Sequence, residues 1–261
     1  MLAGVSSASL YPLETECAVK QLGELGVKNT EIFMNDFSEI SGPIFDEILH
    51  TVRDYGINVV SLHPFTSPME SLFLFSDYPR RQQALIDIYK RYFECMNRLG
   101  ARIFVLHGAI LSAKCSDERY FEQFSRLLDA ADEFGVTVAQ ENISYCKSGS
   151  LDFLKRLREQ CGSRTKYVLD LKQARRSGLK PTEIIDALGK DVIHVHISDA
   201  NGKSDCLPVG AGNEDFPAII GKLKQLDYHG ALLIELYRSN YGGYEELSDG
   251  VKKIEKMLRQ A

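Results

Sequence analysis

The chain has 261 residues, a length that fits one domain around a single large core. It carries 31 basic and 36 acidic residues, for a formal charge of -5. This balance argues against a nucleic-acid partner, since a basic surface supplies most of that affinity. No run of eighteen apolar residues predicts a membrane helix, and the N-terminus lacks the basic and apolar stretches of a signal peptide. We expect a cytoplasmic protein.

Segments typical of strands and of helices alternate from one end of the chain to the other. The expected strands lie at 2–7, 29–34, 57–63, 101–108, 136–141, 166–170, 192–198 and 230–236. The expected helices lie at 13–26, 43–56, 80–100, 116–135, 148–160, 172–178 with 181–189, 215–227 and 244–260. Several of these helices end at Gly, where a left-handed C-cap is expected.

The expected strands are rich in Val, Ile and Leu without clean alternation, which is typical of parallel strands buried on both faces. Eight strand–helix units are the number that a closed (β/α)₈ TIM barrel needs, and no linker or change of composition divides them. We therefore predict an α/β protein with one barrel domain over 1–261. The alternative is an open doubly wound sheet, but no Gly-rich phosphate-binding loop follows any expected strand.

Four expected strands in the second half each end in a residue that can bind a divalent metal ion. These residues are Glu141, Asp170, His196 and Glu235. The carboxyl ends of barrel strands meet at one face, and buried carboxylates are costly unless they are paired or bind a cation. A set of three carboxylates and one imidazole suits one Mn²⁺, Mg²⁺, Zn²⁺ or Co²⁺ ion. The sequence does not decide which ion it is.

Two neighbours of this set have more than one interpretation. His194 faces the same side of its strand as His196 and is either a partner of that ligand or a core histidine. Asp199 either orients a ligand or caps the following loop. The segment 64–79, expected to be a long apolar loop, either covers the pocket or forms a contact between copies of the chain.

Several short motifs resemble the xylose-isomerase-like superfamily of TIM barrels, which contains sugar isomerases, epimerases and endonuclease IV. The motifs are QEN at 140–142, LDLKQA at 169–174, HVHISD at 194–199, VGAGNEDF at 209–216 and IEL at 234–236. The resemblance implies that one divalent metal ion is held by the four strand-end residues. It also implies that Glu141 and Glu235 share the transfer of a proton.

The resemblance implies an isomerase or epimerase that acts on a sugar or sugar phosphate. Such a reaction removes a proton beside a carbonyl and passes through an enediolate, whose charge a metal ion stabilises. The expected substrate contacts are His63, His107, Gln173 and Arg238, of which Arg238 suits a phosphate or carboxylate. Arg175 and Arg176 are expected to lie on a solvated helix face.

The chain departs from the family pattern at three positions. Many members have His where this chain has Gln173 and Cys206, and endonuclease IV has Asp where it has Ser204. The trinuclear zinc site of that nuclease is therefore expected to be incomplete. A metal-assisted phosphodiesterase or AP endonuclease-like hydrolase remains an alternative, as do a polyol or keto-acid dehydratase and a barrel without catalytic activity.

Overall fold

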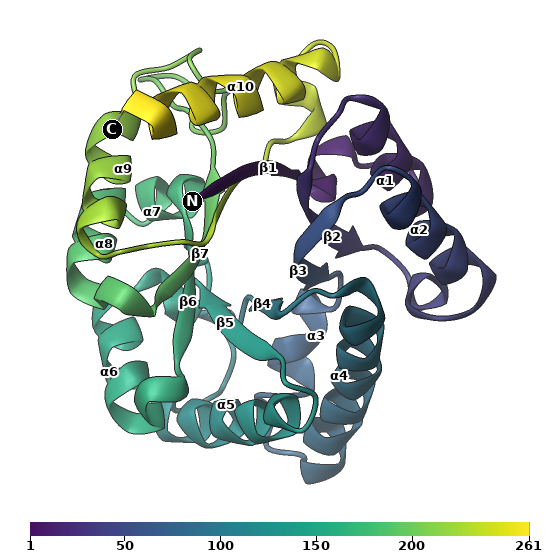
Figure 1. Cartoon of the computed structure of the whole chain (residues 1–261). Coiled ribbons are helices and arrows are strands. Elements are labelled where there is room, and N and C mark those ends of the chain that lie inside the picture. The colour runs from purple at the N-terminus through teal and green to yellow at the C-terminus, as the bar shows by residue number, and fades with distance from the viewer. Residues whose placement is uncertain (261) are drawn as a thin grey trace.

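The computed structural model describes residues 1–260, which form a closed barrel of eight parallel strands in sequence order (Figure 1). The barrel closes where β1 pairs with β8. The strands are β1 Leu2–Ser6, β2 Asn29–Met34, β3 Asn58–Pro64, β4 Ile103–Leu106, β5 Thr137–Glu141, β6 Lys166–Asp170, β7 Val192–Ile197 and β8 Ala231–Ile234. The predicted TIM barrel is confirmed, and the open doubly wound alternative is wrong.

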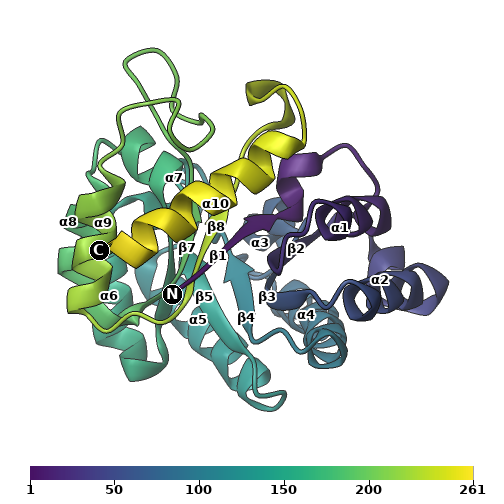
Figure 2. The same cartoon turned by 45° about the horizontal axis from the view of Figure 1, so that its top comes forward.

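Helices surround the barrel in both views of the structure (Figures 1 and 2). The α-helices are α1 Thr15–Glu24, α2 Gly42–Asp54, α3 Ser67–Leu72, α4 Pro79–Leu99, α5 Asp117–Asp132, α6 Leu151–Cys161, α7 Leu171–Arg176, α8 Pro181–Leu188, α9 Phe216–Gln225 and α10 Glu245–Gln260. The 3₁₀ helices are η1 Ser7–Leu10, η2 Phe37–Ile40, η3 Lys147–Gly149, η4 Gly162–Arg164, η5 Gly189–Asp191 and η6 Arg238–Asn240. Within residues 1–260, no helix has both the length and the apolar character needed to cross a bilayer.

The contact between α4 and β4 illustrates how the helices cover the barrel. The helix begins at Pro79 and ends before Gly100, whose left-handed backbone (φ 77°) caps it. Tyr89 and Phe93 project from its apolar stripe and meet the ring of Phe104 edge-on, at centroid distances of 4.8 and 5.2 Å. All three rings are fully buried, so this face of the helix is fixed by aromatic packing.

The barrel interior has an apolar layer and a polar layer. Val105, Ala139 and Val168 form a small cluster apart from the main core. Ser6, Glu31 and Ser61 lie level with one another on the neighbouring strands β1, β2 and β3, and all three are fully buried. A charged residue in the middle of a strand at this depth must have partners inside the barrel.

The segment 64–79 is not the loop predicted from the sequence, because it contains the helix α3. Pro68 and Glu70 lie in the first turn of this helix, where both residue types are favourable. Beyond it, Phe75 is buried and stacks on Tyr120 with a centroid distance of 3.9 Å. Part of the apolar character of the segment is thus explained by internal packing, although Leu72 is 61% exposed.

Candidate metal and catalytic site

The four predicted metal ligands converge at the carboxyl ends of β5 to β8. The Nδ1 atom of His196 lies 3.2 Å from Glu141 Oε1, 3.9 Å from Asp170 Oδ2 and 3.8 Å from Glu235 Oε2. One ligand atom from each residue lies within 4.8 Å of the others. Glu141, Asp170 and His196 are almost completely buried and Glu235 is 15% exposed. We call these four residues the carboxylate centre.

Asp170, the last residue of β6, is held in place by hydrogen bonds to the residue that follows β5 and to the first turn of α7. The side-chain oxygen of Asn142 accepts the Asp170 N–H at 2.7 Å, and its amide donates to the Asp170 carbonyl at 3.0 Å. Asp170 also caps α7, because its Oδ1 accepts the N–H of Gln173 at 2.8 Å. With Oδ1 used in the cap, Oδ2 is the oxygen that faces the carboxylate centre.

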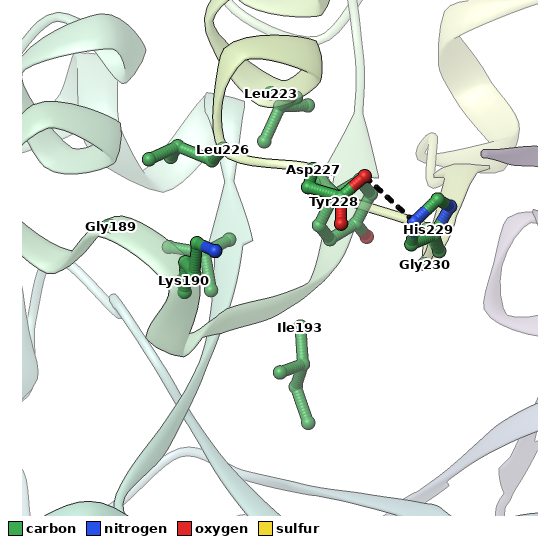
Figure 3. A pocket seen from close by; sticks show the side chains of 10 residues that line it. Gly189, Lys190, Ile193, Leu223, Leu226, Asp227, Tyr228, His229 and Gly230 are labelled. Atoms are coloured by element: carbon green, nitrogen blue, oxygen red, sulfur yellow. Dashed lines mark ion pairs between the residues drawn. The ribbon is translucent and has the colours of Figure 1, made fainter.

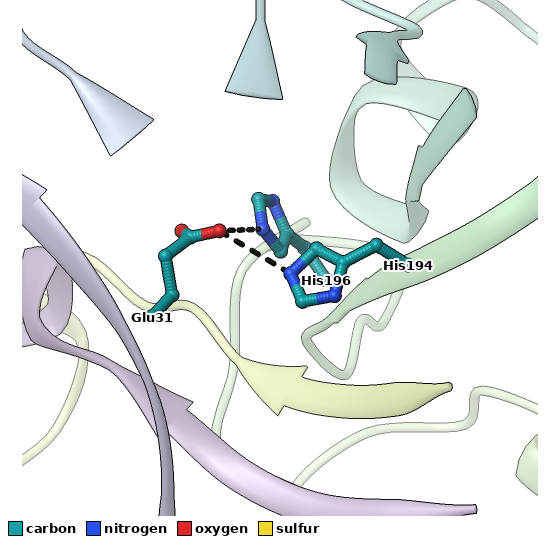
Figure 4. Close-up of side chains that lie close together, drawn as sticks. All are labelled: Glu31, His194 and His196. Carbon is teal, nitrogen blue, oxygen red and sulfur yellow. Dashed lines mark hydrogen bonds and ion pairs between the residues drawn. The ribbon is translucent and has the colours of Figure 1, made fainter. Parts of the chain in front are cut away.

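Glu31 is a buried partner of the centre that the sequence interpretation missed (Figure 4). Its Oε2 lies 3.1 Å from His196 Nε2 and 3.2 Å from His194 Nε2. Ser61 donates to the same oxygen at 2.8 Å, and Ser6 donates to Oε1 at 3.0 Å. His194 is thus a partner of the same carboxylate as His196, which answers the question left open by the sequence. A Glu in the middle of an apolar strand is the signal that could have found this residue.

The bonds of His196 indicate that the centre fits a cation. If Nε2–H donates to Glu31, the neutral ring turns the lone pair of Nδ1 toward three carboxylates, and only a cation or a second proton relieves that repulsion. Burial acts to lower the pKa of His196, but the charges of Glu31 and Glu235 outweigh it and raise the pKa well above its ordinary value. Among residues 1–260, no group makes a hydrogen bond of good geometry to the buried Oε2 of Glu141, although His107 Nε2 lies 3.1 Å from it. These groups are ligands of the type that divalent ions prefer.

The carboxylates of the centre differ in their protonation. Burial, together with the charges of Glu235 and Glu141, raises the pKa of Asp170 to about 7 against the opposing effect of Lys172. Burial also acts to raise the pKa of Glu235, but Lys172 and His196 outweigh it and lower that pKa. The surroundings therefore favour the charged form of Glu235, as a base requires. The charged form of Glu141 is favoured as well, because the effect of burial is outweighed by its histidine partners, which hold its pKa well below its usual range.

His63 and His107 form a second group with Glu141. Their Nε2 atoms lie 2.7 Å apart, and Glu141 Oε2 lies 3.1 Å from His107 Nε2 and 3.8 Å from His63 Nε2. His63 Nδ1 also lies 3.1 Å from the carbonyl of Pro64. These three residues can hold a further ion that shares Glu141 with the carboxylate centre. Both histidines are thus at the site, but they are candidate ligands as well as candidate substrate contacts.

A cavity of about 410 Å³ opens above the carboxylate centre, within the ~300–1,000 Å³ that is usual for small-molecule sites. Its lining includes six of the predicted site residues, which are His63, His107, Glu141, Gln173, Glu235 and Arg238. The half-exposed rings of Tyr145 and Tyr237 stand at its mouth. Asp170 and His196 are not part of the lining and lie in the wall behind it.

Comparison with known proteins identifies the family of this chain. The family model described as xylose isomerase-like TIM barrel matches residues 19–260. The chain belongs to this family. An uncharacterized protein of Mycobacterium leprae is 22% identical and the match covers 91% of this chain and 89% of the relative. A relative from Methanocaldococcus jannaschii, also uncharacterized, is 25% identical, with coverage of 90% and 83%.

Solved structures of sugar epimerases share the fold of this xylose isomerase-like barrel. A D-tagatose 3-epimerase-like protein superposes with a TM-score of 0.83 at 19% identity and covers 100% of this chain and 98% of its own. The D-psicose 3-epimerase of Clostridium cellulolyticum gives 0.79 at 16% identity, with coverage of 100% and 99%. The 3-keto-D-glucoside 4-epimerase of E. coli gives 0.77 at 16%, with coverage of 98% and 99%. At such low identities the likeness establishes the fold alone.

The structure explains what two of the departures from the family pattern do. Gln173 lines the cavity, and its Oε1 accepts hydrogen bonds from the N–H and the hydroxyl of Ser144 at 3.2 and 2.8 Å. Cys206 is buried beside the backbone carbonyl of Glu235, with its Sγ 3.8 Å away. Both residues thus make local packing and hydrogen-bond contacts within this barrel.

Other polar residues near the site have structural partners. Asp199 accepts the N–H groups of Gly210, Gly212 and Glu214 at 2.9–3.0 Å, so it caps the loop after β7. The prediction that Arg175 is solvated is wrong, because it is only 18% exposed and pairs with Glu214. Arg176 is one-third exposed and lines the cavity.

A second cavity, of about 290 Å³, lies at the opposite end of the barrel (Figure 3). It is lined by the first residues of β7 and by apolar side chains that include Ile193, Leu223 and Leu226. Its one ion pair joins the exposed Asp227 and His229 at 3.0 Å. Nothing among these lining residues resembles the carboxylate centre, and active sites of TIM barrels lie at the other face.

Proposed function

We propose that this barrel is a divalent-metal-dependent isomerase or epimerase of a sugar or sugar phosphate. The observation that carries the proposal is the convergence of Glu141, Asp170, His196 and Glu235 at the floor of a cavity of sugar-binding size. A divalent ion held by these residues would supply positive charge beside the substrate oxygens when the adjacent carbon loses its proton. Mn²⁺, Mg²⁺, Zn²⁺ and Co²⁺ all suit this set of ligands.

Glu141 and Glu235 are the proposed proton-transfer groups. Glu141 ends β5 and Glu235 follows β8, the first and last of four neighbouring strands, and both side chains line the cavity. Glu235 removes the proton next to the carbonyl, and Glu141, after taking up a proton from water, returns that proton to the enediolate. Release of the proton on Glu235 to water then restores both groups. If the proton returns to the same carbon from the opposite face, the configuration of that carbon is inverted and the product is the epimer. If the proton returns to the neighbouring carbon, the product is the aldose or ketose isomer.

The remaining proposed contacts orient the substrate. His63, His107 and Gln173 supply donors and acceptors for hydroxyl groups along the cavity wall. Arg238 is held by the carbonyl groups of Tyr241 and Gly242 at 2.9 and 3.1 Å, and it makes no ion pair within residues 1–260. Such an arginine is free to bind a phosphate or carboxylate at the outer end of the cavity.

Solvent deuterium uptake tests the role of Glu235. The wild type is screened against ketoses and ketose phosphates in D₂O, and label at the carbon beside the carbonyl identifies the substrate. Glu235→Gln should then abolish uptake while its unfolding curve stays cooperative. Glu255→Gln, at an exposed position of α10, is the matched control. Uptake that persists in Glu235→Gln would contradict the proposed base.

A metal-assisted phosphodiesterase or AP endonuclease-like hydrolase is the second candidate. The group of His63, His107 and Glu141 favours it, since hydrolases of this kind use two ions about 3.5–4 Å apart. Turnover of a phosphodiester such as bis(p-nitrophenyl) phosphate with two ions per chain, without deuterium uptake into any sugar, would select this function.

A further inference from the structure

A buried lysine lies beside the carboxylate centre without belonging to its ligand set. Lys172 is the second residue of α7, and its side chain is 5% exposed. Its Nζ lies 2.9 Å from Glu235 Oε2 and 3.4 Å from Asp170 Oδ2. It therefore contacts two of the three carboxylates that the proposed metal ion would use.

The ammonium group is confined by an aromatic ring as well as by the carboxylates. Lys172 Nζ lies 4.9 Å from the ring centre of Tyr237. Two carboxylate oxygens lie within 3.4 Å of Nζ, so the buried ammonium group has the counter-charges that it needs. The side chain thus carries a fixed positive charge in a place from which water is largely excluded.

Lys172 offsets negative charge that one divalent ion would leave at the carboxylate centre. Glu141, Asp170 and Glu235 carry three negative charges when ionised, and one divalent ion leaves one of these uncompensated. The Lys172 ammonium supplies the missing positive charge. Glu31 adds a further negative charge on the far side of His196, so the Lys172 ammonium reduces the net charge of the buried site and does not exceed it.

We propose that Lys172 is a built-in counter-cation of the carboxylate centre, which holds Glu235 and lowers the affinity of the centre for a divalent ion. This inference rests on the proposed function, in which that centre binds the ion. The ammonium repels the incoming cation and competes with it for Glu235 and Asp170. The centre therefore binds its ion more weakly than three free carboxylates and an imidazole would.

Calorimetric titration of the chelator-treated protein with Mn²⁺ tests the sign of this effect. Lys172→Met removes the charge but keeps much of the side-chain length, and it should bind Mn²⁺ at least about tenfold more tightly than the wild type. Lys166→Met is the matched control, because Lys166 lies at the other end of β6 and pairs with Asp191 at 2.6 Å. Its affinity should equal that of the wild type.

A second neutral variant shows whether a change in affinity comes from the lost charge or from misfolding of one variant. Lys172→Gln is also neutral but polar, and it should shift affinity in the same direction. In both neutral variants, added Mn²⁺ should raise the unfolding temperature more than it does in the wild type.

Each outcome decides between the two proposals. Suppose that the wild type binds Mn²⁺ tightly and that both neutral variants bind it equally well or more weakly. This result would overturn the role of Lys172 and would not contradict the proposed function. Weaker binding would mean that Lys172 only anchors Glu235. Binding by the neutral variants but not by the wild type would support the counter-cation and remove the metal-dependent function. No binding by any variant would refute both.

Discussion

The buried carboxyl group of Glu70 should make the stability of this barrel depend on pH. Tyr89 donates a hydrogen bond to its Oε1 at 2.9 Å, and the N–H of Gly108, next to His107, donates to its Oε2. Burial raises the pKa of Glu70 from 4.5 to about 8, against these two hydrogen bonds. The folded protein therefore keeps a proton that the unfolded chain releases near pH 4.5.

The size and sign of the effect follow from this shift. Stability is greatest below the unfolded pKa and falls as pH rises through the folded pKa, by about 1.4 kcal/mol per pH unit. Between about pH 6 and pH 8 the loss is about 2 kcal/mol. Glu70→Gln mimics the protonated acid, because its amide oxygen can still accept the Gly108 N–H, and so it should remove this loss.

Urea unfolding across this pH range measures the effect as the difference between wild type and Glu70→Gln. Other titrating groups are shared and cancel in the difference. Glu94→Gln, at an exposed position of the helix that carries Tyr89, is the matched control and should follow the wild type. If the curves of the wild type and Glu70→Gln run parallel from pH 6 to pH 8, within about 0.5 kcal/mol, the reasoning is wrong.

Two further predictions concern the site itself. Glu31→Gln removes the negative charge that strengthens the hydrogen bonds of His194 and His196 to Oε2, so Mn²⁺ affinity should fall by about tenfold or more while unfolding stays cooperative. Unchanged affinity in a calorimetric titration would mean that Glu31 does not orient His196. Arg238→Met should raise KM for a phosphorylated substrate by about tenfold and leave KM for its unphosphorylated analogue unchanged, whereas equal effects on both would contradict an anion contact.

The fold was predictable because it depends on repetition. Eight apolar strands, each followed by a helix that often ends at Gly, leave few architectures other than a closed barrel. The segment 64–79 was the exception, because Pro68 and its apolar neighbours suggested a loop. In the structure Pro68 lies in the first turn of α3, and Phe75 packs against Tyr120, a residue distant in sequence that local patterns do not reveal.

The candidate site was predictable where its residues lie at the ends of strands. Glu141 and Asp170 end apolar strands, and parallel strands of a barrel bring such ends together. Glu31 was missed because it lies within a strand, where only the closed barrel brings it to His196. The position of Lys172 was also hidden, because α7 begins directly after β6 and Lys172 lies in its first turn, where strand alternation does not predict that it meets Glu235.

Counting the ions bound per chain tests the proposed centre most directly. The protein is stripped with chelator, dialysed against Mn²⁺ or Zn²⁺ and measured by elemental analysis beside Glu141→Gln. One tightly bound ion in the wild type, lost in Glu141→Gln, is the expected result. Two or three ions per chain would contradict the single-ion isomerase or epimerase and bring His63 and His107 into the ligand set. No bound ion would remove the metal-dependent function altogether.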